Sequence, residues 1–113
     1  MELKTIGDVT AVVMVPRFDA YTANDVETTL KDQIAKGTKK IVVDFSQTEY
    51  IASAGLRVLL SIAKQLQKLS GQIVLFSMKP YVYEVFEISG FTQIFKICSS
   101  QQQALESLKS SEK

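Results

Sequence analysis

The residue best placed to do chemistry in this chain is Ser53, in the stretch 50–56, Tyr-Ile-Ala-Ser-Ala-Gly-Leu. This stretch joins the strongest predicted strand to the longest amphipathic helix. The first backbone N–H groups of a helix lack partners within it, so a serine there is ordinarily a capping residue. The same N–H groups also favour a bound phosphate. Because Ala54 and Gly55 are small, they leave the hydroxyl open to an incoming partner. The plain interpretation of Ser53 is a helix cap.

The composition removes several classes of chemistry from consideration. The chain has no histidine and a single cysteine, Cys98, so neither a Ser-His-Asp triad nor a Cys- or His-rich zinc site can be built within it. It also lacks a G-x-G-x-x-G phosphate fingerprint. We therefore expect no catalytic residues, no metal and no cofactor. Cys98 cannot form an internal disulfide, which is compatible with a reducing cytosol, and we expect it to be a small buried residue.

Size and charge predict one domain with little net charge. With 113 residues, of which 46% are apolar, the chain is long enough for one core and one domain spanning 1–113. Thirteen basic and twelve acidic residues leave a net charge of +1, so direct binding to nucleic acid is not expected. No apolar run reaches the roughly 20 residues that cross a bilayer, and the first residues lack a signal-peptide pattern. These features predict a cytoplasmic protein with no membrane partner.

The elements that must position Ser53 alternate between strands and helices. Strands are expected at 3–6, 9–15, 41–45, 72–76 and near 95–97. Helices are expected at about 23–36, from the Ser53 turn to before Gly71, from Pro80 to Gly90, and at 101–109. The polar residues 110–113 are expected to fray.

This pattern predicts an α/β fold of order β-β-α-β-α-β-α-β-α. Its sheet should be mixed but mostly parallel, with four to five strands, about four helices and an antiparallel first strand. Loops that follow the carboxyl ends of parallel strands gather on one edge. We therefore expect the segments 19–21, 50–55 and 77–79 to lie together.

The helix after Ser53 has an apolar face that covers about half of its circumference. The residues on that face are Leu56, Val58, Leu59, Leu60, Ile62, Ala63, Leu66 and Leu69. A face of this width favours packing against a neighbouring helix as well as the sheet, and the alternative is a partner docking on Val58 and Ile62. The next helix should pack through Val82, Val85, Phe86 and Ile88.

Several segments, in this order and spacing, resemble one family. They are 18–23 (Phe-Asp-Ala-Tyr-Thr-Ala), 41–45 (Ile-Val-Val-Asp-Phe), 50–56, 88–91 (Ile-Ser-Gly-Phe) and 103–105 (Gln-Ala-Leu). The stretch 50–56 is similar to the signature Asp-Ser-[Ser/Thr/Ala]-Gly-Leu of the STAS domain. The chain therefore resembles the STAS domains of bacterial anti-sigma factor antagonists, which act by partner switching, and the resemblance implies a single STAS-like fold.

The resemblance also implies a function. It identifies Ser53 as the position phosphorylated by a serine kinase that is itself the anti-sigma factor. Unphosphorylated antagonist would bind the anti-sigma factor and free the sigma factor, phosphorylation would release it, and a serine phosphatase is a further implied partner. Added negative charge at a contact can repel a partner without refolding the domain. The expected partner-binding residues are Asp19, Tyr21, Tyr50, Ala52, Ala54, Gly55, Arg57 and Met78.

Three positions depart from the family pattern. Ala52 replaces the signature aspartate, Pro16 replaces a common glycine, and Arg57 replaces a small residue one helical turn from Ser53. Arg57 would either pair with a phosphate on Ser53 or point to solvent. Ala52 supports an alternative function, a STAS ligand-sensing module that is not phosphorylated and binds a nucleotide or small anion at the same edge.

The surrounding residues also have plain structural interpretations. Asp19 is either a turn residue or a partner contact, and Asp44 is either a carboxylate satisfied by local N–H groups or a weaker candidate contact. Tyr21 and Tyr50 either pack within their loops or anchor an interface. Met78 is a loop residue that would rim the site.

Overall fold

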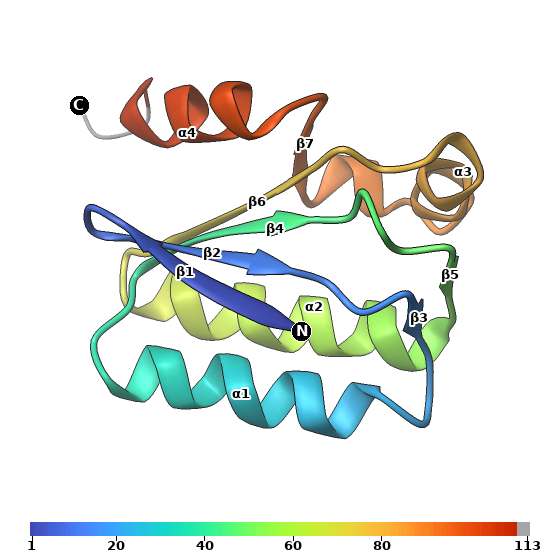
Figure 1. Cartoon of the computed structure of the whole chain (residues 1–113), viewed down its shortest axis with the longest axis horizontal. Helices are drawn as coiled ribbons and strands as arrows, with labels where there is room; N and C mark the ends of the chain where they lie inside the picture. The colour runs from blue at the N-terminus through green and yellow to red at the C-terminus, as the bar shows by residue number, and fades with distance from the viewer. Residues whose placement is uncertain (111–113) are drawn as a thin grey trace.

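The computed structural model describes residues 1–110, built around one mixed β-sheet (Figure 1). Its strands are β1 (Glu2–Ile6), β2 (Val9–Val13), β4 (Lys40–Asp44), β6 (Gln72–Phe76) and β7 (Lys96–Cys98). They lie in the spatial order β1-β2-β4-β6-β7, with β1 antiparallel to β2 and every other pair parallel. The hairpin between β1 and β2 turns at Gly7, whose φ of 61° favours glycine.

Helices cover both faces of this sheet. They are α1 (Ala23–Ala35), α2 (Ser53–Lys68), α3 (Pro80–Ile88) and α4 (Gln101–Ser110), with a short 3-10 turn η1 (Phe91–Gln93) before β7. Helices α1 and α2 run side by side on one face, and α4 lies across the other (Figure 1). The predicted α/β class, the mostly parallel sheet and the order of its elements are confirmed.

A second, two-stranded sheet was not predicted. Strand β3 (Arg17–Phe18) pairs in parallel with β5 (Tyr50–Ile51) at one end of the molecule, next to the start of α2 (Figure 1). Each strand has two residues, too few to produce the alternation by which strands are recognised in a sequence. This small sheet joins the loop after β2 to the turn that carries Ser53.

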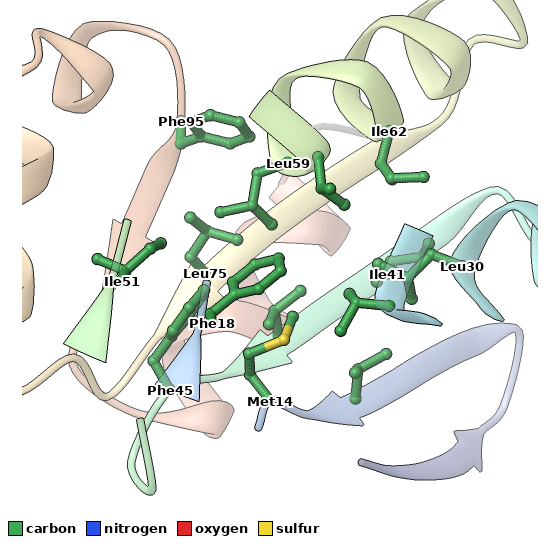
Figure 2. Packing of buried hydrophobic residues seen from close by; sticks show 14 of the residues in the cluster. Met14, Phe18, Leu30, Ile41, Phe45, Ile51, Leu59, Ile62, Leu75 and Phe95 are labelled. Atoms are coloured by element: carbon green, nitrogen blue, oxygen red, sulfur yellow. The ribbon is translucent and has the colours of Figure 1, made fainter. Parts of the chain in front are cut away.

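The hydrophobic core holds the small sheet in place. Phe18 of β3 is fully buried and belongs to the main apolar cluster beneath α1 and α2. Figure 2 shows Phe18 beside Met14, Phe45 and Leu75. Burying a side chain of this kind contributes about 2 kcal/mol, so β3 is anchored although it is short. A smaller cluster, which includes Ala104 and Leu108, packs α4 on the opposite face.

Of the apolar positions predicted to pack in α2 and α3, two, Leu69 and Ile88, are exposed. Val58 and Ile62 are buried against the sheet and α1, which confirms packing over partner docking. Leu69 is exposed because α2 ends at Lys68 and the chain leaves the helix there. Ile88 is 81% exposed, since six residues after Val82 it lies about 240° around α3, away from the core.

The remaining expectations concern the end of the chain and Cys98. Helix α4 runs through Ser110, one residue into the predicted tail, and the fraying predicted for residues 111–113 lies outside the described residues. Cys98 is half-buried rather than fully buried. Within residues 1–110, no helix combines the length and apolar character needed to cross a bilayer.

Candidate functional site

Ser53 is the first residue of α2, and its side chain is exposed. The N-cap position belongs to Ala52, whose φ of −113° and ψ of 174° are those of a capping residue, but whose methyl group accepts no hydrogen bond. The prediction that Ser53 caps the helix is therefore wrong, because the cap lies one residue earlier. In the described part of the chain, the amide N–H groups of Ser53 and Ala54 have no hydrogen-bond partner.

The start of α2 is held by backbone contacts instead. The Ala52 N–H donates to the Phe18 carbonyl oxygen at 3.0 Å, and the Ala52 carbonyl accepts from the N–H groups of Gly55 and Leu56 at 2.9 and 3.2 Å. Gly55 is buried, and a Cβ there would stand 2.8 Å from the Phe18 carbonyl oxygen. Gly55 is therefore required for close approach of α2 to β3, while Ala54 is half-buried and packs against the main core.

Asp19 is largely buried in the loop after β3, with 13% of its side chain exposed. Its Oδ1 accepts a hydrogen bond from the Tyr21 N–H at 3.0 Å, and its Oδ2 lies 3.4 Å from Nε of Arg17. The Thr22 hydroxyl accepts from the Asp19 N–H at 3.1 Å and donates to the Arg17 carbonyl at 2.7 Å. The turn interpretation of Asp19 is thus confirmed in geometry, and the carboxylate also orients Arg17.

Arg17 is a site residue that the sequence analysis missed. Its guanidinium carbon lies 4.5 Å from the centre of the Tyr50 ring, a cation–π contact, while it pairs with Asp19 on the other side. Arg17 and Tyr50 face each other because they are register partners in the small sheet. Pairing between two-residue strands leaves no pattern in a sequence, so only that register reveals the contact.

Tyr21 projects from the same loop and is 94% exposed. Packing within the loop is therefore the wrong interpretation for Tyr21. Tyr50 is also exposed, although its ring is partly covered by Arg17. Exposed tyrosine side chains are enriched at surfaces that contact another protein.

The other expected site residues take separate places. Arg57 is exposed one turn along α2 from Ser53 and has no ion pair within residues 1–110. Met78 is half-buried, packs against the main core and lines a groove of about 570 Å³ that includes Tyr83 and Cys98. Asp44 accepts a hydrogen bond from a local N–H, that of Ser46, at 2.8 Å, as expected for a strand-end carboxylate.

The geometry determines what this site can do. It offers one open hydroxyl on a rigid frame, with two unpartnered N–H groups beside it and the positive end of the α2 dipole behind it. Among the described residues, no group of three His, Cys, Asp or Glu side chains gathers to hold a metal ion. Such a site suits a modification or a contact made by another protein.

The comparisons with known proteins agree with this class of site. The family model described as "STAS domain" matches residues 1–104. The chain belongs to the STAS domain family. Several of the relatives that it matches within that family are described as anti-sigma factor antagonists.

Three of these relatives show the extent of the likeness. A protein of Bordetella bronchiseptica described as the anti-sigma factor antagonist BtrV is 46% identical over 87 residues, which are 77% of this chain and 75% of that protein. A solved structure described as an anti-sigma factor antagonist of Thermotoga maritima is 25% identical, with a TM-score of 0.89, over 96% of this chain and 93% of that one. The phosphorylated form of Bacillus SpoIIAA shares the fold, with a TM-score of 0.74 at 17% identity over 93% of this chain and 96% of that one.

Proposed function

We propose that this protein binds an anti-sigma factor that is also a serine kinase, and that phosphorylation of Ser53 releases it. Free antagonist would sequester the anti-sigma factor and so permit transcription that depends on the sigma factor. A serine phosphatase would restore the unphosphorylated form. Because sigma factors act on RNA polymerase, the exchange would take place in the cytoplasm.

The observation that carries this proposal is the free Ser53 hydroxyl at the head of α2. The side chain caps nothing and is exposed, so a kinase can reach it without unfolding the helix. The neighbouring N–H groups of Ser53 and Ala54 are also unpartnered in the described structure. They would stabilise a phosphate there, as the helix dipole does.

The frame around Ser53 supports a switch of surface charge rather than of fold. Phe18 and Gly55 lock the helix to the small sheet, and Asp19 and Arg17 fix the adjoining loop. A phosphate adds about 1.5 to 2 negative charges at neutral pH. A partner seated over Ser53 and Tyr21 would meet these charges in a desolvated contact, which would weaken binding without moving the backbone.

The test is phosphorylation by the partner itself. The protein is used as bait in an extract of its source cells, the captured anti-sigma factor is purified, and both are incubated with ATP. Mass spectrometry should find one phosphate, on Ser53, and none on the Ser53→Ala variant. Ser46→Ala is the matched control, since Ser46 is likewise an exposed serine that follows a strand closely, and that variant should be phosphorylated normally.

Two results would contradict the proposal. One is a phosphate on another residue while Ser53 stays unmodified. The other is full binding of the anti-sigma factor by Ser53→Asp, since a carboxylate at this position supplies part of the negative charge that is meant to release the partner.

A further inference from the structure

Helix α2 carries three cations that nothing in the described structure neutralises. Arg57, Lys64 and Lys68 are exposed, and none of them has an ion pair within residues 1–110. At about 100° per residue their positions fall within an arc of about 40°. They therefore form one stripe along the helix, called here the cationic stripe, and Ser53 lies at its head, within about 60° of every member.

The neighbouring helix α1 is arranged differently. There Glu27 pairs with Lys31 at 3.0 Å and Asp32 pairs with Lys36 at 3.1 Å. The hydrogen bond from Lys31 lowers the pKa of Glu27, which also interacts with Ser61 of α2. Glu27 reaches α2 but already pairs with Lys31, so the cationic stripe remains available to a partner.

The surface between the cations is hollowed. A shallow depression of about 340 Å³ is lined by the cationic stripe together with Leu60, Ser61 and Gln65. Its lining therefore combines an apolar side chain, two hydrogen-bonding side chains and three cations. The stripe from Arg57 to Lys68 is about 17 Å long and begins about 6 Å along the helix axis from Ser53.

We propose that the cationic stripe docks an acidic segment of the protein that contacts Ser53. The inference rests on the proposed function for the placement of the partner, because the stripe continues directly from the site at the head of α2. Carboxylates spaced along the segment would pair with Arg57, Lys64 and Lys68 in turn. Nucleic acid is a poorer occupant, since a net charge of +1 and three cations give little of the basic field that such binding needs.

This docking gives Arg57 a role in the switch. A phosphate on Ser53 would lie one helical turn from Arg57. There the phosphate would repel the acidic segment and compete with its carboxylates for the Arg57 guanidinium. Arg57 stands where the family pattern has a small residue. It would link the phosphorylated Ser53 to the cationic stripe that binds the partner.

The test uses a defined probe, so that it does not depend on finding the partner. A helical peptide of about 16 residues with a glutamate at every fourth position is titrated into the ¹⁵N-labelled full-length protein. The amides of residues 57–68 should shift, and the binding should weaken as salt is raised, because the contacts are exposed ion pairs. Each of Arg57→Gln, Lys64→Gln and Lys68→Gln should weaken binding about threefold, and the triple variant about 25-fold.

The matched control is the triple variant Lys4→Gln, Lys96→Gln and Lys109→Gln. These lysines are exposed and unpaired in the described structure but lie on β1, β7 and α4, so the net charge changes equally while the peptide affinity should not. Equal loss in the control, or equal binding of a peptide with glutamine in place of glutamate, would overturn the proposal. So would tighter binding of a DNA duplex at residues 57–68. None of these results bears on whether Ser53 is phosphorylated, so the two proposals fail separately.

Discussion

Replacing Ala52 by aspartate should stabilise this protein. Ala52 holds the N-cap position of α2 in the extended backbone conformation that capping requires, with a side chain that cannot cap. The N–H groups of Ser53 and Ala54 have no hydrogen-bond partner among the described residues. The next N–H group, that of Gly55, donates to the Ala52 carbonyl. An aspartate at position 52 would supply the missing acceptor.

The size of the effect follows from known capping energies. Exchanging alanine for a good N-cap residue is worth about 1 kcal/mol, and this includes the favourable interaction of a carboxylate with the helix dipole. For 113 residues the entropy of unfolding is about 0.24 kcal/mol/K near 60 °C, so Tm should rise by about 4 °C. Differential scanning calorimetry and urea titration of the wild type and Ala52→Asp would measure both quantities.

Ser53→Ala is the informative companion variant. If Ser53 were the cap, its loss would cost about 1 kcal/mol, whereas an exposed serine that caps nothing should change stability by less than about 0.5 kcal/mol. The account is refuted if Ser53→Ala destabilises strongly while Ala52→Asp has no effect, because that pattern would place the cap on Ser53.

Three further predictions test the site and its frame. Gly55→Ala should destabilise by about 1 to 2 kcal/mol in urea, because its Cβ would meet the buried Phe18 and this overpacking exceeds the gain in helix propensity; unchanged stability would contradict the close approach. The hydrogen bond and charge of Lys40 lower the pKa of Asp8 below its ordinary 3.8. The Asp8 carboxylate therefore stabilises the fold fully above pH 3.8, and this contribution is lost as the pH falls through the lowered pKa of the folded state. Asp8→Asn should therefore lower the urea midpoint near pH 7 but not near pH 2. The same difference in midpoint at both pH values would contradict this prediction. Tyr21→Ala should leave Tm unchanged and weaken binding of the captured anti-sigma factor at least about fivefold by calorimetric titration; a fall in Tm would instead show a packing role.

The main sheet was predictable because its strands are long enough to show a pattern. The apolar runs that became β2, β4 and β6, separated by helix-length segments, required parallel strands with crossover helices. Glycine also marked the helix ends, as with Gly37 and Gly90, whose positive φ values of 107° and 80° suit the left-handed region.

The details of the site were less predictable because they depend on pairing across the fold. Arg17 and Tyr50 come together only through the register of two strands that are each two residues long. Residue type alone favours Ser53 as the cap, but the end of β5 at Ile51 puts Ala52 at the N-cap position. Tertiary context thus places the cap on Ala52 and leaves the Ser53 hydroxyl free of it.

The most direct test of the central claim is a comparison of two affinities. The captured anti-sigma factor would be titrated into the protein before and after stoichiometric phosphorylation at Ser53, with circular dichroism to compare the folds. We expect at least about tenfold weaker binding by the phosphorylated form, a difference of about 1.4 kcal/mol, with an unchanged spectrum. Equal affinity of the two forms would contradict the claim that Ser53 is the switch.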